Sequence, residues 1–215
     1  MSFVNFSKKE ISFKIVYYGA PLCGKTTNLE QVHASVPEGA RGPMTMLSTR
    51  QDRTLYFDFL PLETDVIKGF ISRFQLYTVP GQAIYNLTRR LVLNDVDGMV
   101  FVCDSQFDQM ENNVESFKNL EENLGMDGRD LTEMPYVLQY NKRDLTEIAP
   151  THYLDFMLNN RETRVETFDA VALKGEGVHE TLNTIAKLVM AKFIKDHNME
   201  MGSALKTTQV AGKDA

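Results

Sequence analysis

The sequence predicts an α/β protein built on a mostly parallel sheet of six or seven strands, with helices on both faces. Two observations carry this prediction. Strand-like apolar runs alternate with helix-like segments from end to end of the chain, and a glycine-rich loop joins the first run to the first helix. The length of 215 residues and the hydrophobic fraction of 43% favour one folded domain with a sizeable core.

Five short runs have the composition of strands: residues 13–18, 55–60, 72–77, 99–103 and 136–140. The fourth is apolar throughout, as expected of a strand that is covered on both faces. The second and third flank a short stretch that contains Lys68 and Gly69, and they can form an antiparallel pair around it. Residues 168–173 are the candidate for a last strand.

Helical periodicity appears in three segments. Residues 26–36 follow the glycine-rich loop, and residues 109–124 follow the apolar fourth run. From Val178 to Phe193, apolar residues recur at every third or fourth position, which predicts an amphipathic closing helix. Residues 1–197 therefore form the expected domain, whereas the polar and unpatterned residues 198–215 predict a disordered tail.

Composition limits the environment and the partners. The net charge is −6 and no cluster of Lys and Arg stands out, so nucleic-acid binding is not expected. Cys23 and Cys103 lie in apolar or glycine-flanked stretches and are expected to be reduced and buried. No apolar window is long enough to span a bilayer, Ser2 replaces the glycine that N-myristoylation needs, and no C-terminal cysteine is present for prenylation. We expect a cytoplasmic protein without direct membrane insertion.

The loop Gly19-Ala20-Pro21-Leu22-Cys23-Gly24-Lys25-Thr26 matches the phosphate-binding pattern G-x-x-x-x-G-K-S/T. Glycines let the backbone turn its N–H groups toward phosphate oxygens, and the start of the following helix adds a positive dipole end. Lys25 supplies a charge to the β- and γ-phosphates, and the Thr26 hydroxyl is a candidate Mg²⁺ ligand. The plain alternative is a glycine-rich turn that happens to contain a lysine. The motif alone does not separate ATP from GTP.

Asn141-Lys142-Arg143-Asp144 follows the last of the five strand runs and matches N-K-x-D, the guanine-reading motif of GTPases. The Asp144 carboxylate offers two acceptors to the paired N1–H and N2–H donors of guanine, and adenine lacks that pair. Adenine would leave buried acceptors unsatisfied, at about 1–3 kcal/mol each. Four ordinary loop residues are weak evidence by themselves. In combination with the phosphate loop, they favour GTP.

Pro80-Gly81-Gln82 follows the third strand run. In GTPases a glycine at this place senses the γ-phosphate through its N–H, and the next glutamine orients the attacking water. The alternative is an ordinary Pro-Gly turn. The position after a strand favours the switch interpretation.

Together these motifs resemble the Ras-like small GTPases, which are P-loop GTPases of α/β fold, over roughly residues 13–193. More closely, the chain is similar to the MglA type of bacterial gliding-motility and cell-polarity GTPases. The stretches that carry this closer resemblance are residues 14–19, 22–29, 53–62, 77–82 and 139–145.

The resemblance implies further residue roles. Thr54 corresponds to the first-switch threonine, which binds Mg²⁺ and the γ-phosphate in the GTP state. Arg53 resembles a built-in arginine finger, Gln82 the water-positioning glutamine, and Ala172 stands where a backbone N–H meets O6 of guanine. The expected catalytic residues are Gln82 and Arg53, and the expected Mg²⁺ ligands are Thr26 and Thr54. The expected nucleotide-binding set is Gly19, Ala20, Pro21, Leu22, Cys23, Gly24, Lys25, Thr26, Thr27, Thr54, Gly81, Asn141, Lys142, Asp144, Ala172 and Leu173.

Three positions depart from the general Ras pattern. Thr78 begins the second switch where Asp is usual, which removes a charge near Mg²⁺ but agrees with the MglA type. Val171-Ala172-Leu173 replaces Ser-Ala-Lys, so only the Ala backbone contact carries over firmly. Pro21 replaces a common glycine near the γ-phosphate, and its ring restricts φ.

The resemblance implies a molecular switch that binds GTP or GDP with Mg²⁺, hydrolyses GTP slowly, and regulates cell polarity and motility by gliding or type IV pili. Its implied partners are a Roadblock-domain GTPase-activating protein, an exchange factor and polar effector proteins, with recruitment to one cell pole in the GTP state. Two alternatives stay open: a P-loop ATPase or nucleotide kinase, which gives Asn141 and Asp144 no role, and a GTP-binding scaffold without hydrolysis, against which Gln82 counts.

Overall fold

The computed structural model describes residues 2–48, 53–59, 67, 69–82 and 85–197; for residues 46–48 and 53–59 it describes the backbone only. The strands are β1 (Phe3–Asn5), β2 (Glu10–Tyr18), β3 (Thr45–Ser48), β4 (Arg53–Phe59), β5 (Ile71–Thr78), β6 (Gly98–Asp104), β7 (Tyr136–Asn141) and β8 (Thr167–Asp169). The helices are α1 (Lys25–Ser35), α2 (Asn86–Leu93), α3 (Met110–Met126), α4 (Thr151–Leu158) and α5 (Val178–His197).

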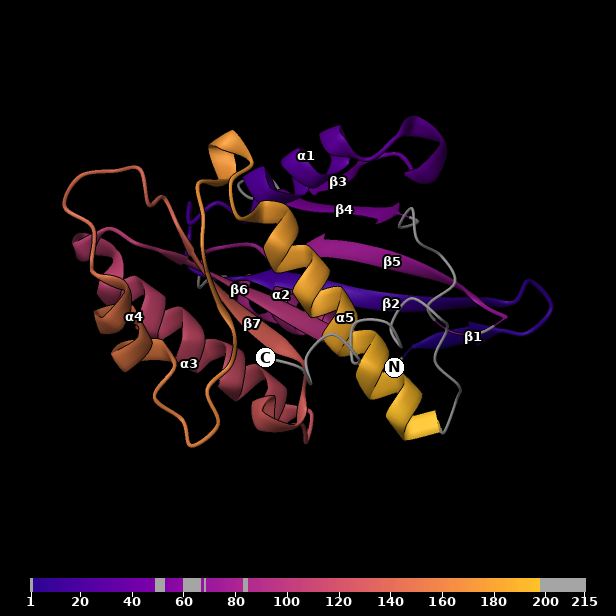
Figure 1. Cartoon of the computed structure of the whole chain (residues 1–215). Helices are drawn as coiled ribbons and strands as arrows, with labels where there is room; N and C mark the ends of the chain where they lie inside the picture. Colours follow the sequence, from indigo (N-terminus) through magenta and orange to yellow (C-terminus); the bar gives the residue numbers. More distant parts are fainter. Residues whose placement is uncertain (1, 49–52, 60–66, 68, 83–84, 198–215) are drawn as a thin grey trace, which may run out of the picture.

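Among the described residues, one sheet holds eight strands in the order β3-β4-β5-β2-β6-β7-β8, with β1 paired to β2 outside that order (Figure 1). Strands β5, β2, β6, β7 and β8 are parallel, and β1, β3 and β4 are antiparallel to their neighbours. The predicted α/β class and mostly parallel sheet are confirmed. The strand count exceeds six or seven because β1 and β3, of three and four residues, were not recognised as strands.

Helices cover both faces of the sheet. Helices α1 and α5 pack with one apolar cluster, which includes Leu29 and Ile185, and α2, α3 and α4 pack with the other, which includes Leu93, Phe117 and Leu154. In Figure 1, α5 crosses one face of the sheet, while α3 and α4 lie together at the left of the molecule. The central strands supply both clusters, because alternate side chains of a strand point to opposite faces.

The buried strands and the closing helix follow the predicted pattern. All seven residues of β6 are buried, as expected of a strand covered on both faces. β4 and β5 form the predicted antiparallel pair, with Phe57 opposite Leu76. In α5 the predicted apolar positions are buried: Val178, Leu182, Ile185, Val189 and Phe193 are 0–4% exposed.

The expected strand over residues 168–173 is only partly correct. β8 ends at Asp169, and residues Ala172–Lys174 form a 3-10 turn, η5. The chain turns back because the Val171 N–H donates to the Glu176 carbonyl oxygen and Gly175 adopts a φ of 79°. This turn places Ala172 and Leu173 beside the end of β7.

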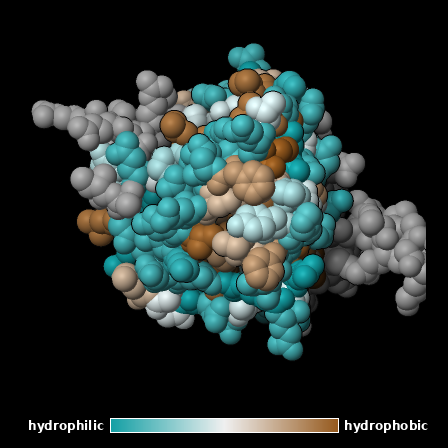
Figure 2. Space-filling model, turned by 90° about the vertical axis from the view of Figure 1, so that its left-hand side faces the viewer, coloured by the Kyte–Doolittle hydropathy of each residue, from teal (hydrophilic) through white to brown (hydrophobic). Residues whose placement is uncertain are grey.

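Figure 2 shows the side of the molecule on which α3 and α4 lie, where a small apolar group is surrounded by hydrophilic side chains. The exposed aromatic residues there are Phe107, Tyr153 and Phe156, and the rings of Phe107 and Tyr153 are 6.0 Å apart between centroids.

Cys23 and Cys103 are both free and buried, as predicted. Within the described ranges, no helix combines the length and apolar character that crossing a membrane requires.

Candidate nucleotide-binding site

The carboxyl ends of the parallel strands bring the sequence motifs to one edge of the sheet. β2 leads into the phosphate loop, β5 into Pro80 and Gly81, and β7 into the N-K-x-D motif, while η5 follows β8. Ligands of open α/β sheets bind at this edge. The fold therefore brings together motifs that are more than a hundred residues apart in the sequence.

The phosphate loop has a backbone that requires glycine at two positions. Gly19 has a φ of 142°, and a Cβ there would lie 2.2 Å from the Val102 carbonyl oxygen. Gly24 has a φ of 106°, and a Cβ there would lie 2.1 Å from the Asn141 side-chain nitrogen. Leu22 also has a positive φ, 59°, and its side chain is 89% exposed. Strain of this kind collects at ligand-binding loops.

Lys25 begins α1 and folds back over the loop. Its side chain is 6% exposed, and its Nζ donates to the carbonyl oxygens of Gly19 and Ala20 at 2.9 and 2.7 Å. The ammonium group therefore lies inside the loop, beside the positive end of the helix dipole. Thr26 follows in the first turn, and its hydroxyl is the hard oxygen donor that Mg²⁺ prefers.

Asn141 connects three loops of the site. Its Nδ2 donates to the Cys23 carbonyl oxygen at 2.8 Å, and its Oδ1 accepts from the Ala172 N–H at 2.8 Å. Asn141 is 3% exposed, so both bonds are shielded from water. The phosphate loop, the N-K-x-D motif and η5 are thus held together by one side chain.

The neighbouring motif residues are also held by ion pairs. Lys142 adopts a left-handed φ of 66°, and its Nζ donates to the Asp104 carboxylate at the end of β6. The Asp144 carboxylate pairs with Lys174 of η5 over 3.3 Å, and 30% of the Asp144 side chain is exposed. Asp144 is therefore positioned by its neighbours but accessible to a ligand.

The Ala172 N–H has a different partner from the one that the sequence predicts. It donates to Asn141, so contact with O6 of guanine would require it to exchange this bond. The side chain of Leu173 is 78% exposed, directly after Ala172.

The switch residues lie at the same edge. A Cβ on Gly81 would lie 2.5 Å from the Pro21 Cα, so the start of the second switch packs directly on the phosphate loop. The Gln82 side chain is exposed. Arg53 begins β4, and the β4–β5 register pairs Tyr56 with Tyr77. The side chains of Arg53 and Thr54 lie outside the described residues.

Sequence reasoning missed a buried amide pair behind the site. Asn28 of α1 and Gln139 of β7 are both 0% exposed, and each amide donates to the other's oxygen, at 2.8 and 2.9 Å. Gln139 also donates to the Thr181 hydroxyl at 3.1 Å. The signal in the sequence was a single polar residue inside an otherwise apolar strand run.

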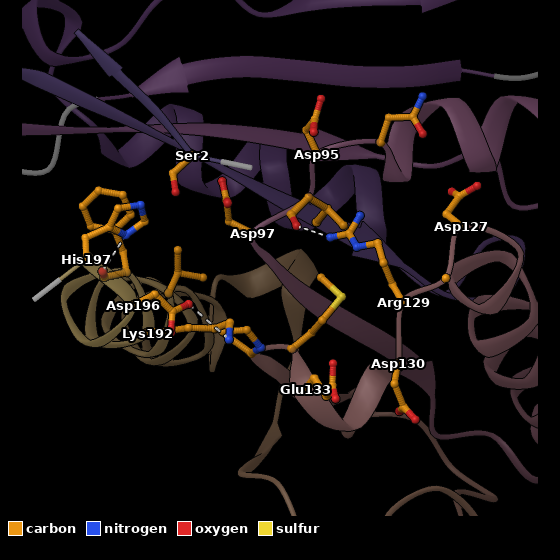
Figure 3. A pocket seen from close by; sticks show the side chains of 17 residues that line it. Ser2, Asp95, Asp97, Asp127, Arg129, Asp130, Glu133, Lys192, Asp196 and His197 are labelled. Atoms are coloured by element: carbon orange, nitrogen blue, oxygen red, sulfur yellow. Dashed lines mark hydrogen bonds and ion pairs between the residues drawn. The ribbon is translucent and has the colours of Figure 1, made fainter.

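A hollow of about 600 Å³ lies at the opposite edge of the sheet, away from all of these motifs (Figure 3). Its lining includes Asp97 and Pro135, which directly precede β6 and β7. Arg129 points toward the start of β6 and donates to the Leu93 and Val96 carbonyl oxygens, at 3.0 and 2.5 Å. The nucleotide motifs do not contribute to this hollow.

Comparison with known proteins decides the family. The model of the ADP-ribosylation factor family, Arf, matches residues 2–189. The chain belongs to this family. It is a small GTPase with the Ras-like P-loop fold, as its motifs and sheet topology indicate.

Curated relatives agree with this assignment. The GTPase is similar to the mutual gliding-motility protein MglA of Myxococcus xanthus, with 50% identity over 195 residues, 91% of this chain and 99% of that protein. It is also similar to the GTPase Obg of Akkermansia muciniphila, with 28% identity over 82% of this chain and 48% of Obg. For Obg of Elusimicrobium minutum the identity is 29% over 80% of this chain and 36% of Obg. The chain therefore spans less than half the length of the two Obg proteins.

Proposed function

We propose that this GTPase is a switch that hydrolyses GTP slowly and regulates bacterial cell polarity and motility, by gliding or type IV pili. The 50% identity to the gliding-motility protein MglA, over 99% of that protein, supports the motility role. The observation that carries the nucleotide role is the Asn141 bridge, because it joins the phosphate loop to the two segments expected to contact guanine.

In this proposal, base recognition depends on Asp144. Its carboxylate accepts from guanine N1–H and N2–H, and Lys174 orients it from the opposite side. The backbone N–H groups of Ala172 and Leu173 are the candidate donors to O6, with the Ala172 N–H exchanging its Asn141 partner. Lys142 keeps the loop in its left-handed turn through Asp104.

The phosphates lie along the N–H groups of residues 19–27. Lys25 moves from the Gly19 and Ala20 carbonyl oxygens to the β- and γ-phosphates, since a charged phosphate oxygen is a stronger acceptor than a neutral carbonyl. Thr26 and Thr54 supply hydroxyl ligands for Mg²⁺, which neutralises charge on the phosphates when it is bound. The Gly81 N–H senses the γ-phosphate beside Pro21.

Hydrolysis breaks the bond between the γ-phosphorus and the bridging oxygen, and a water oxygen forms the new bond. Gln82 holds that water in line with the bond that breaks. Arg53 supplies positive charge to the phosphoryl oxygens from the same chain, and its position at the start of β4, which pairs antiparallel with β5, supports this role. Loss of the γ-phosphate then releases the switches.

The proposed partners are a Roadblock-domain protein that accelerates hydrolysis, an exchange factor, and effectors at one cell pole. We propose that the GTP-bound protein is cytoplasmic and is recruited to that pole by these partners. The motility effectors would read the switch segments, since these change with the γ-phosphate.

Single-turnover hydrolysis with and without a Roadblock-domain partner tests the proposal. We expect slow GTP turnover by the GTPase alone and strong acceleration by the partner. Arg53→Ala and Gln82→Leu should bind GTP nearly normally and lose at least about tenfold in accelerated turnover, equivalent to about 1.4 kcal/mol of transition-state stabilisation. If the partner accelerates turnover by Arg53→Ala as strongly as by the wild type, the catalytic cation comes from the partner and not from Arg53.

A further inference from the structure

The guanidinium group of Arg89, on α2, lies inside the molecule next to the end of β5. Arg89 is 3% exposed. Its Nε donates to the Pro80 carbonyl oxygen at 2.9 Å, one terminal nitrogen donates to the Gly81 carbonyl oxygen, and the other donates to Asn119 Oδ1 at 2.6 Å. All three acceptors are neutral, and no carboxylate within the described part of the chain is paired with this buried cation.

The two carbonyl contacts fix two successive peptide planes. The Pro80 carbonyl shares its planar peptide unit with the Gly81 N–H, and in a trans unit the two bonds point in opposite directions. By holding the Pro80 oxygen, Arg89 therefore directs the Gly81 N–H away from α2. The bond from Arg89 to the Gly81 carbonyl oxygen fixes the next peptide plane, which joins Gly81 to Gln82.

The opposite side of Gly81 is closed by the phosphate loop. A Cβ on Gly81 would lie 2.5 Å from the Pro21 Cα, so this segment has little room to move toward the loop. Gly81 is thus held between Pro21 on one side and Arg89 on the other. The direction of its N–H follows from both contacts.

A cluster of amides on α2 and α3 holds Arg89 in turn. Asn119 Oδ1 also accepts from the Tyr18 hydroxyl at 2.6 Å, and Asn119 Nδ2 donates to Asn86 Oδ1 at 3.0 Å. Asn123 Nδ2 donates to the same Asn86 oxygen at 2.8 Å. The guanidinium plane also lies over the Tyr18 ring, 5.5 Å from its centroid. Three asparagines and a tyrosine therefore keep the fork of Arg89 aimed at Pro80 and Gly81.

We propose that Arg89 is the positioning residue of the γ-phosphate sensor, and that it sets the preference of this GTPase for GTP over GDP. The inference rests on the proposed role of Gly81. The hydrogen bonds of Arg89 go to Pro80, Gly81 and Asn119, and not to the phosphate loop or the N-K-x-D motif, so its contribution is specific to the nucleotide that carries a γ-phosphate. The amide cluster connects this preference to the packing of α2 on α3.

Arg89→Lys tests the proposal, because a lysine keeps the charge but loses the fork that holds two carbonyl oxygens at once. The dissociation constants of GDP and of the non-hydrolysable β,γ-imido analogue of GTP are measured for each variant. We expect the analogue to bind about tenfold more weakly, equivalent to about 1.4 kcal/mol, and GDP to change by less than about twofold. Arg90→Lys is the matched control, since Arg90 is adjacent on α2 and pairs with Asp127 at the surface.

Two outcomes overturn the proposal: an unchanged ratio of the two constants in Arg89→Lys, or an equal loss for both nucleotides. If Arg89→Lys does not fold, Asn119→Ala replaces it, because Asn119 is only half-buried and its loss releases one of the three donors of Arg89. Asn119→Ala should also weaken binding of the GTP analogue more than binding of GDP. An unchanged ratio of the two dissociation constants again contradicts the proposal. Failure of the wild-type protein to bind either guanine nucleotide would instead refute the proposed function.

Discussion

The Asn141 side-chain amide donates a hydrogen bond of 2.8 Å to the Cys23 carbonyl oxygen, and so fastens the N-K-x-D loop to the phosphate loop. The same side chain accepts from the Ala172 N–H. Asn141 therefore shapes the site for any nucleotide, whereas Asp144 is placed to read the base.

We predict that Asn141→Ala weakens binding of all nucleotides and destabilises the fold. Two buried groups, the Cys23 carbonyl and the Ala172 N–H, lose their partner, at about 1–3 kcal/mol each. Thermal unfolding of the GDP-free protein measures the stability loss, and titration with GDP and GTP measures the affinity. Asn112→Ala is the control, because Asn112 is exposed and its side-chain amide donates to Gln109, away from the site. Wild-type stability in Asn141→Ala would contradict the bridging role.

The buried pair of Asn28 and Gln139 predicts strong energetic coupling. Gln139→Leu should destabilise the protein by about 1–3 kcal/mol, because the buried Asn28 Oδ1 loses its donor, while Asn28 Nδ2 keeps its bond to the Gly24 carbonyl oxygen. The double variant Asn28→Leu with Gln139→Leu should recover part of that loss, as both polar groups are then removed. Denaturant unfolding of the two single variants and the double variant gives the coupling free energy. Additive losses would show that the pair does not act as a unit.

The strongly periodic elements could be predicted from the sequence, and α2 could not. On α2, Leu87 and Leu91 are 70% and 60% exposed while Arg89 is buried, which reverses the pattern that a surface helix normally shows. The burial of Arg89 depends on oxygens from Pro80, Gly81 and Asn119, and these contacts are tertiary. A local pattern cannot reveal them.

The phosphate loop, Pro80-Gly81 and the N-K-x-D motif lie at one edge of the sheet, because each follows a strand and parallel strands end at one edge, and their part in nucleotide binding stays a prediction. The residues that hold the motif side chains in position were not predicted from the sequence. Asp104, which anchors Lys142, is the last residue of the fully buried strand β6, and the pairing depends on the β6–β7 register. The early end of β8 was missed because Val171 and Leu173 have strand propensity, while the turn is set by Gly175 and by the Val171–Glu176 contact.

Cys103 should be unreactive in the native protein. Burial raises the pKa of its thiol well above the ordinary value, and only the thiolate is nucleophilic. Because the folded pKa is the higher one, the stability that this group contributes is complete below the unfolded pKa and is lost as the pH rises toward the folded value. Iodoacetamide at about pH 8 should label Cys103 only after denaturation. Rapid labelling of the folded protein would show that the thiol is accessible.

Thr26→Asn should impair Mg²⁺-dependent GTP binding more than GDP binding. The substitution removes the hydroxyl that we propose as a Mg²⁺ ligand, and Mg²⁺ would offset the additional negative charge of the γ-phosphate in GTP. Titration of each nucleotide with and without Mg²⁺ measures the effect. Thr26→Ser is the matched control, because it keeps a hydroxyl group at the same position. A Mg²⁺ dependence equal to that of the wild type in Thr26→Asn would remove Thr26 from the proposed metal ligands.

The most direct test is a nucleotide competition between wild-type protein and Asp144→Asn. Wild-type protein should prefer GTP over both ATP and xanthosine triphosphate. In Asp144→Asn the amide offers one donor and one acceptor in place of two acceptors, which suits xanthine, so GTP affinity should fall and xanthosine triphosphate affinity should rise, each by at least about tenfold. Asp127→Asn, at an exposed ion pair with Arg90, should leave the preference for GTP unchanged. An Asp144→Asn protein that still selects GTP as the wild type does would contradict the assignment of the guanine-binding site.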